Sequence, residues 1–534
     1  MRLSHGILAV AMAALAAVSA PALSENEAPG APPACFEGAP PQPPACQIDK
    51  LVSAQLAKLG LRPASICSDA VFVRRAYLDV IGKLPTAQEA ESFIADPAED
   101  KRTKLLDSLL DREEFADYWA MKWSDTLRIK AEFPVKLWPK AAQGYHRWVR
   151  TCIAENRPYN RVAHELLMAT GSSFYVPEVN FQRAVQNRDA SGLAKAVALT
   201  FMGMRAENWP QPRVDAMAAF FSQVSYKSTL EWKEEIVYLD PAKAPAADTR
   251  YELPDGSAVT VPAGADARKV FADWLVSPRN PHFARCAVNR IWYWLMGRGI
   301  IQEPDDIRPD NPPSNPKLLA YLERELVASG YDLKHVYRLI LNSQTYQRSS
   351  IPPAGNAQAA AKLVQNFGAY PLRRLEAEVL IDALCQITGT GEEYSSAVPE
   401  PFIYLPKGAR AVAFADGNTS SAFLELFGRP GRDTGFASER NDGINAAQRL
   451  HMLNSSQVRN KIVSGPKVQS LLGGQRRPGD AVRKLYLTIL SRPPLDQELQ
   501  TIQAYGKANG LSGRDAAMDL VWALVNSDEF LYRH

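Results

Sequence analysis

The segment VRRAYLDVIGKLPTAQE, residues 73–89, carries the clearest information about the fold. Its apolar residues recur at helical spacing up to Gly82, and glycine commonly ends a helix. Pro85 then leads a turn, and Thr86 and Glu89 have the spacing of a capping box, which starts a second helix. The segment therefore predicts two helices joined by a proline-led turn.

The same pattern returns near the other end of the chain, as VRKLYLTILSRPPLDQE at residues 482–498. After each copy comes another apolar helical pattern that reaches a Glu-Phe pair, at 114–115 and at 529–530. A helix pair of this kind buries its apolar face against neighbouring elements. The repeat thus indicates an architectural unit that is used twice, and not a catalytic motif.

Helical patterns also fill most of the chain between the two copies. Residues 231–262 are different, because they alternate as strands do around the turn signal Pro254-Asp255-Gly256. Residues 391–420 are rich in Gly, Ser and Pro and are expected to form loop with short strands. The predicted fold class is mainly α: a multi-helical two-domain protein with a small β-insertion and a repeated helix-turn-helix unit. The other segments predicted to be helical are 101–110, 113–127, 146–155, 161–170, 190–204, 315–330, 333–343 and 373–388.

The N-terminus has the pattern of a secretory signal. A basic residue at position 2 is followed by an apolar run over 6–18 and by Ala20-Pro21-Ala22, which suits a signal-peptide cleavage site. The alternative is an uncleaved membrane anchor, although a membrane span needs about 20 apolar residues. No other segment is long enough, so no transmembrane span is expected and the mature protein is predicted to be periplasmic or extracellular.

The chain divides into five predicted segments. They are a signal peptide (1–22), a flexible Pro/Ala-rich leader (23–48), an N-terminal helical domain (49–230), a β-containing insertion or linker (231–264) and a C-terminal helical domain (265–534).

The charge balance argues against nucleic acid as a partner. The chain has 61 basic and 58 acidic residues, a net charge of +3, and no block of like charges. Such a balance produces no long-range field for a polyanion. The basic doublets at 74–75 and 373–374 are expected on solvated helix faces or in local ion pairs.

Six cysteines remain in a chain that is predicted to be exported, where disulfides can persist. Cys35 and Cys46 flank a Pro-rich stretch and are candidates for a short bridge, with Cys46–Cys67 as the alternative pairing. Cys152, Cys286 and Cys385 lie at apolar-periodic positions and are expected to be buried thiols. Because the chain has no C-x-x-C-H motif, it has no attachment signature for c-type haem.

Residues 278–350 alternate large apolar residues with polar ones of fixed hydrogen-bond geometry, more than a helical core needs. Two readings are open: a buried network with internal ion pairs, or a ligand site in which guanidinium groups bind carboxylates. The candidate catalytic residues are His282, Asp305 and Asp306. Oxygen ligation of calcium by Asp305, Asp306, Asp310 and Asn311 is a further alternative, but the spacing is not that of an EF-hand. The candidate ligand-binding residues are Arg285, Asn289, Arg290, Arg298, Arg308, Arg429 and Arg440, with Arg432 beside them.

Several motifs together resemble the planctomycete cytochrome-associated family of paired uncharacterised domains, over residues 49–534. In this family an N-terminal domain is followed by a C-terminal one, often with a c-type cytochrome module fused in front. The motifs that carry the resemblance are FVRRxYLDxIGxxPTxxE (72–89), NRPY (156–159), NPxFARxxVNRIW (280–292), GRGxxxxxDD (297–306), PSNP (313–316), NSxTYQxS (342–349) and FGRP (427–430).

The chain departs from that family at two places. The family's first domain commonly carries a C-x-x-C-H-x-H-type element before an aromatic segment, and here residues 203–210 read GMRAENWP. Its second domain commonly carries C-x-C-E-R, and here residues 436–440 read FASER. The resemblance implies that the two elements serve one metal or haem centre and that this chain has lost it. We therefore expect no metal and no cofactor.

The leading hypothesis is an exported scaffold or interaction protein of a cell-envelope assembly, a cofactor-free derivative of a redox-associated family. Its partner would be another envelope protein, with a c-type cytochrome as one candidate. Exposed aromatic side chains favour such interfaces, and Trp138, Trp209 and Trp232 are the candidates. One alternative is an envelope enzyme that acts on a carbohydrate or an anionic polymer through the Arg/Asp/His cluster near 280–310. Another is a redox-complex subunit that relies on a separate cytochrome.

Overall fold

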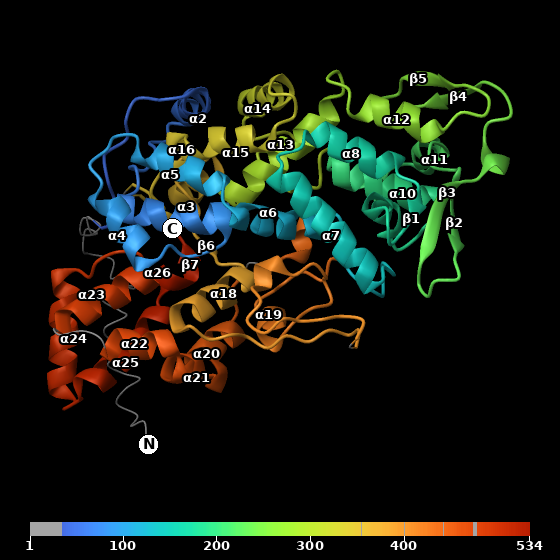
Figure 1. Ribbon diagram of the computed structural model, residues 1–534. Coiled ribbons are helices and arrows are strands. Elements are labelled where there is room, and N and C mark those ends of the chain that lie inside the picture. The colour runs from blue at the N-terminus through green and yellow to red at the C-terminus, as the bar shows by residue number, and fades with distance from the viewer. Residues whose placement is uncertain (1–34, 354, 400, 442, 474–477) are drawn as a thin grey trace.

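The computed structural model describes residues 35–353, 355–399, 401–441, 443–473 and 478–534. The predicted signal peptide and residues 23–34 of the predicted leader lie outside the described residues. The described chain is mainly helical with a few short strands, which confirms the predicted fold class (Figure 1). None of its helices combines the length and the apolar composition that crossing a bilayer requires.

The first part of the chain is a series of helices that ends in a short two-residue strand. These elements are α2 (Gln47–Lys58), α3 (Asp69–Ile81), α4 (Ala87–Ala95), α5 (Lys101–Leu110), α6 (Glu113–Thr126), α7 (Pro139–Ala154), α8 (Tyr159–Met168) and β1 (Gly171–Ser172).

The middle of the chain contains the small sheets. Strand β3 pairs antiparallel with both β1 and β2, and β4 pairs antiparallel with β5. The predicted β-insertion is confirmed for β3, β4 and β5, while β1 and β2 were not anticipated. The elements are α9 (Asn180–Arg183), α10 (Ala190–Val197), α11 (Gln211–Ala219), β2 (Val224–Ser228), β3 (Glu235–Leu239), β4 (Thr249–Glu252), β5 (Ala258–Val261), α12 (Ala267–Leu275), α13 (Pro281–Met296), α14 (Pro316–Ala328), α15 (Leu333–Leu341), α16 (Gln344–Gln347) and α17 (Ala357–Gln365).

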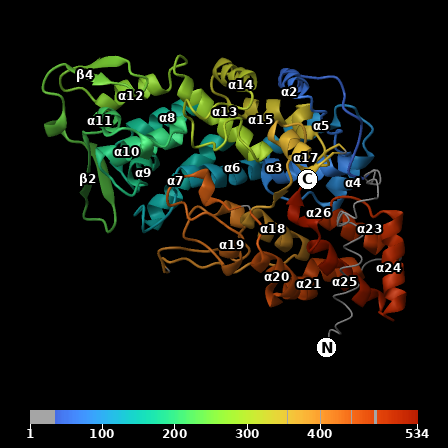
Figure 2. The same ribbon diagram turned by 180° about the vertical axis from the view of Figure 1, so that it is seen from behind.

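The last part returns to the N-terminal helices and forms a layer beside them, as both views show (Figures 1 and 2). Strand β6 pairs with β7 at the end of the chain, so the C-terminus lies against α3. The elements are β6 (Arg373–Arg374), α18 (Ala377–Thr388), α19 (Ala422–Leu426), α20 (Ala446–Asn454), α21 (Ser456–Ser464), α22 (Pro466–Gly473), α23 (Pro478–Ile489), α24 (Asp496–Ala508), α25 (Gly513–Val525), α26 (Asp528–Leu531) and β7 (Tyr532–Arg533).

The sequence repeat corresponds to two similar helix pairs, α3–α4 and α23–α24. The predicted capping box at the start of α4 is present, with Thr86 and Glu89 in both reciprocal bonds. In the first unit Arg112 pairs with Glu89 and Glu114. In the second, Arg492 pairs with Glu498 and Glu529, which occupy the equivalent acidic positions.

The two units also contact each other, because α4 packs against α23. Arg74 of α3 donates to the carbonyl oxygens of Ile489 (2.8 Å) and Phe530 (2.9 Å) at the ends of α23 and α26. At the repeat-equivalent position, Arg483 makes an exposed ion pair with Glu91 (2.9 Å). Arg74 of the first unit thus places a buried positive charge at the C-terminal carbonyls of α23 and α26 in the second unit. A cation is favoured there because the free carbonyls at a helix C-terminus carry partial negative charge.

Several expectations are corrected here. The doublets at 74–75 and 373–374 are mainly buried, not solvated, because their guanidinium groups donate to backbone carbonyls and carboxylates. The helix that was predicted over 373–388 begins only at Ala377, since Arg373 and Arg374 form β6. The end of the predicted leader is not free either: Gly38 donates its N–H to the carbonyl of Ile66 (2.7 Å), and α2 begins at Gln47.

Neither candidate cysteine bridge, Cys35–Cys46 or Cys46–Cys67, is formed. All six cysteines are free thiols. The Sγ of Cys46 donates to the Asp49 carboxylate (3.1 Å), whereas the carbonyl of Cys35 accepts from Ser68. Cys152 and Cys286 are buried as expected, and Cys385 is half-buried.

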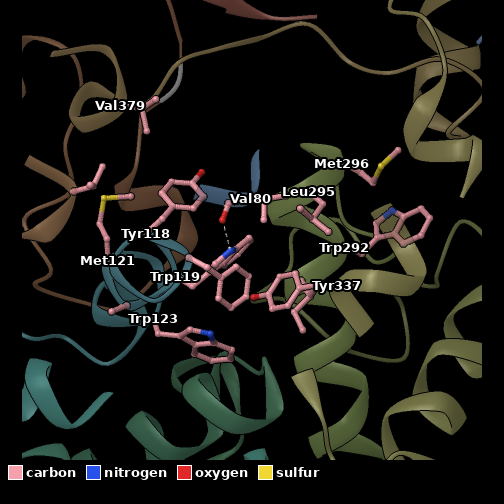
Figure 3. Packing of buried hydrophobic residues seen from close by; sticks show 14 of the residues in the cluster. Val80, Tyr118, Trp119, Met121, Trp123, Trp292, Leu295, Met296, Tyr337 and Val379 are labelled. Atoms are coloured by element: carbon pink, nitrogen blue, oxygen red, sulfur yellow. Dashed lines mark hydrogen bonds between the residues drawn. The ribbon is translucent and has the colours of Figure 1, made fainter. Parts of the chain in front are cut away.

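An aromatic core joins the N-terminal and C-terminal helices (Figure 3). Trp119 of α6 has its ring centre 4.3 Å from that of Tyr337 of α15, with the two rings tilted, and donates its indole N–H to the carbonyl of Val80 in α3 (3.1 Å). Trp294 of α13 lies 5.1 Å from Trp123 of α6. Helices on both sides of the β-insertion therefore share one packed interior.

We predict that Arg74→Gln lowers the free energy of unfolding by about 3 kcal/mol, because two buried carbonyls lose a charged donor. Urea denaturation of the purified protein measures this. Arg483→Gln is the matched control at the equivalent repeat position, and its exposed pair predicts a loss under about 1 kcal/mol. Equal losses in the two variants would contradict the role given to Arg74.

Candidate functional site

The predicted residues of the 280–310 region form a paired network rather than an open cluster. Arg290 of α13 lies 3.0 Å from the carboxylate of Asp305, and both side chains are almost fully buried. The Arg290 guanidinium also donates to the carbonyls of Leu199 and Thr200, in the π-helical turn Ala198–Met202. π-turns leave carbonyls out of the regular ladder, and here a buried cation satisfies them.

The catalytic candidates do not come together. His282 is in the first turn of α13, eight residues before Arg290, which places it about 12 Å away along the helix. Burial is the main cause that lowers the pKa of His282, and the positive charge of the nearby Arg285 lowers it further. Asp306 pairs instead with the exposed Arg308 (3.2 Å). The structure therefore shows no acid–base arrangement of His282, Asp305 and Asp306.

Two of the remaining candidates of this region, Asn289 and Arg285, have structural partners. Asn289 makes two hydrogen bonds with the backbone of Ile301, one in each direction. Arg285 pairs with Glu323 at 2.7 Å. Arg298 keeps a buried Nε without a hydrogen-bond partner, and no function follows from it.

The oxygen ligands that we considered for calcium are used otherwise. Asp305 binds Arg290, and Arg308 binds both Asp306 and Asp310. Within the described ranges, no three His, Cys, Asp or Glu side chains are placed so that they could hold a metal ion.

The C-terminal arginine candidates form a second network, which reaches into the N-terminal helices. Arg440 forks between Glu378 of α18 and Asp125 of α6, with a closest N–O distance of 2.7 Å to each. Arg432 pairs with the other oxygen of Asp125 (2.9 Å). Arg429 lies 3.7 Å from Glu378 and donates to backbone carbonyls of the 416–419 segment.

Electrostatics keep the carboxylates of Glu378 and Glu376 ionised. Burial acts to raise the pKa of Glu378, but Arg440 and Arg429 outweigh it and lower the pKa to about 2. Glu376, two residues earlier, accepts from Lys122 (2.5 Å) and Arg533. Burial opposes ionisation there too, yet Arg533 and Lys122 hold the pKa of Glu376 well below its ordinary value.

A cavity of about 410 Å³ lies beside the two networks. Its walls come from α6, α13, β6, Glu376 at the N-cap of α18, β7 and the segment 430–444, so the elements on both sides of the β-insertion build it together. The charged lining residues are Lys122, Asp125, Arg290, Glu303, Arg373, Arg374, Glu376 and Arg440.

The sequence predictions identified Arg290 and Arg440 in this cavity and missed the other charged lining residues. Arg373 and Arg374 were noticed as a doublet but assigned to the surface. Lys122 and Asp125 lie in an aromatic helix, and charged residues among aromatic ones are the sequence signal of a buried network there.

The two segments that depart from the family pattern lie beside each other. The guanidinium of Arg205 stands 5.1 Å from the ring centre of Phe436. The N–H of Ala437 donates to Asp305 (2.6 Å), and the N–H of Ile307 donates to the carbonyl of Gly203 (2.8 Å). Segments 203–210 and 436–440 are therefore neighbours through the loop that contains Asp305, as one shared site would require.

Two of the three tryptophan candidates for docking are adjacent. The ring centres of Trp138 and Trp232 are 4.6 Å apart, and Phe402 lies 5.2 Å and 5.1 Å from them. We call these three residues the aromatic cluster. Trp209 is not part of it, since it packs against the core and stacks on Arg213.

We predict that Glu378→Gln lowers the free energy of unfolding by about 3 kcal/mol at pH 7, because Arg440 loses one of its two carboxylates. The pKa of Glu378 is depressed in the folded state, so its contribution is complete above about pH 4.5 and declines as the pH falls towards 2. The difference between variant and wild type should accordingly shrink by more than half between pH 6 and pH 3, measured by urea denaturation.

The control for this prediction is Asp528→Asn, which removes the exposed partner of Arg449. Its effect should be small at every pH. A Glu378→Gln penalty that stays constant down to pH 3 would contradict the assignment.

Comparison with known families identifies two models. One, described as PSCyt2, protein of unknown function (DUF1549), matches residues 47–225, and the other, described as PSD1, protein of unknown function (DUF1553), matches residues 267–506. No curated protein and no solved structure matches the chain. The chain thus belongs to the planctomycete cytochrome-associated family in which these two domains of unknown function are paired.

Proposed function

We propose that this chain is an exported scaffold protein of a cell-envelope assembly that binds another envelope protein through the aromatic cluster. A c-type cytochrome is one candidate for that partner. The observation that carries the proposal is the contact of the half-buried Trp138 with the exposed Trp232 and Phe402, which come from three separate segments. Trp138 precedes α7, Trp232 lies between β2 and β3, and Phe402 follows α18, and these segments meet on one side of the molecule (Figure 1).

The cluster is exposed to an extent that is unusual for such side chains. Trp232 is 59% exposed and Phe402 is 42% exposed. Further exposed apolar residues occur in the same segments: Phe133, Leu230 and Tyr404. Exposed aromatic residues in mutual contact mark interaction sites, and tryptophan is enriched among the residues that dominate binding energy.

The surroundings of the cluster carry charges of both signs. Lys233 lies over the rings of Trp138 and Trp232 and pairs with Glu132, and the exposed Glu231 is the chain neighbour of Trp232. We therefore expect a partner surface with an apolar centre and a rim of mixed charge.

The alternative of an envelope enzyme has less support. An enzyme of the 280–310 region would need His282, Arg290 and Asp306 around one open site. Instead Arg290 is paired with the buried Asp305, and the other two lie elsewhere. Arg290 lines the charged cavity without His282 or Asp306, so the acid–base group that this enzyme would need is not assembled there.

The docking proposal predicts that Trp232→Ser combined with Phe402→Ser abolishes recovery of a specific partner. The full-length protein, tagged at its C-terminus, would be purified from gently solubilised envelopes, and bound proteins would be quantified by mass spectrometry. The loss should be at least about tenfold, because central aromatic anchors contribute 2 kcal/mol or more. Raising the salt concentration should weaken the wild-type complex through its charged rim.

Leu450→Ser is the control, since Leu450 is 57% exposed on α20 and is not in the cluster. It should recover the same partner as the wild type. The proposal fails if the double variant recovers that partner unchanged, or if the wild type is recovered alone as a monomer.

Export is tested separately. If residues 1–22 are a signal peptide that is cleaved after Ala22, N-terminal sequencing of the protein from its native host should begin at Leu23. An intact Met1 terminus would favour the membrane-anchor alternative.

A further inference from the structure

We propose that the cavity between α6, α13 and β6 binds a sugar-sized organic anion, with a carboxylate or phosphate group on a ring-containing body. The proposal rests on the size, charge and walls of the cavity and does not depend on the aromatic cluster. Its volume of about 410 Å³ is within the range of small-ligand sites, which is about 300–1,000 Å³.

Its charge favours an anion. Five cationic side chains line it: Lys122, Arg290, Arg373, Arg374 and Arg440. Buried and half-buried carboxylates pair with several of them: Glu376 with Lys122, Asp305 with Arg290, Asp79 with Arg373, and both Asp125 and Glu378 with Arg440. Arg429, Arg432 and Arg533 bind these same carboxylates, so the group has eight cations for five carboxylates and keeps an excess of positive charge. Glu303, which also lines the cavity, is exposed.

The chemical type of the cationic side chains also favours the binding of a carboxylate or phosphate. Four of the five that line the cavity are arginines, whose planar forks match the oxygens of carboxylates and phosphates. They are held in place by packing and by bonds to fixed groups: Arg373, for example, donates to the carbonyls of Trp294 and Leu295. A ligand would meet preorganised donors and would not have to order them.

The uncharged lining residues suggest an organic body. Tyr293, Trp294, Phe436 and Tyr532 provide aromatic surface, and Thr126 and Ser438 provide hydroxyl groups. This mixture of rings and polar groups suits a ligand with both an apolar face and hydroxyls, as sugars have.

A second, apolar cavity differs from the charged cavity and does not suit a ligand. It lies between α6, α7, α8 and α15, is lined by residues such as Trp119 and Trp123, and has a volume of about 40 Å³. That is room for a few waters at most, in a site with few polar partners. It is a packing defect of the aromatic core, whereas the charged cavity is ten times larger.

The charged cavity has a solvent-exposed margin. Leu372 is 61% exposed and Ser438 is also exposed, and both belong to the lining. Changes at these two positions can therefore alter access without removing a buried ion pair.

Isothermal titration of the purified full-length protein tests the proposal. The test ligands are D-glucuronate and glucose 6-phosphate, with glucose and inorganic phosphate as controls. At least one of the organic anions should bind with a Kd below about 1 mM, and the one that binds decides between carboxylate and phosphate. Glucose should bind at least about tenfold more weakly, because it lacks the charge.

Two variants at the margin sharpen the test. Leu372→Glu adds a negative charge at the opening and should weaken binding at least about fivefold, whereas the matched neutral change Leu372→Gln should not. Ser438→Trp should abolish binding by filling the opening. Unchanged melting temperatures would confirm that these exposed substitutions leave the fold intact.

The proposal is overturned if neither organic anion binds, if glucose binds as tightly as glucuronate, or if inorganic phosphate alone binds. It is also overturned if Leu372→Glu and Leu372→Gln have equal affinities. None of these results bears on partner docking by the aromatic cluster, so the two proposals fail independently.

Discussion

The fork of Arg440 between Asp125 and Glu378 joins three segments that lie far apart in the sequence. Burying charged groups is expensive unless each has a partner, and removing one partner of a buried pair typically costs about 3–5 kcal/mol. The fork therefore constrains where α6, α18 and the 428–441 segment can lie. Since α6 belongs to the first family domain and the other two segments to the second, this constraint explains why the two domains form one interior.

Other contacts also join the N-terminal helices to the C-terminal part of the chain. The Lys122–Glu376–Arg533 group extends the network towards the C-terminus, and β7 holds Arg533 beside β6. The repeated helix pairs meet at the same end of the molecule through Arg74. Two further features of the molecule are the cavity with charged walls and, on another part of the surface, the aromatic cluster. Partner docking is thus assigned to residues outside the buried networks, whereas the cavity shares Lys122, Arg290 and Arg440 with them.

Local features of this fold were predictable from the sequence, and long-range partners were not. Thr86 and Glu89 revealed a helix start because a capping box is contained in four residues. The acceptors of Arg74 are carbonyls more than 400 residues away, and carbonyls carry no sequence signal. Trp138 and Trp232 were recognisable as candidates from their residue type, but Phe402 lies in a Gly/Ser/Pro-rich segment whose path only the structure reveals.

Native-state hydrogen exchange, followed by mass spectrometry in the wild type and in Arg440→Met, tests the central claim most directly. If the fork couples the two domains, the variant should lose protection in peptides of α6 as well as in those of α18 and the 428–441 segment, because the segments open together. Loss of protection confined to 428–441, with α6 and α18 unchanged, would contradict the account.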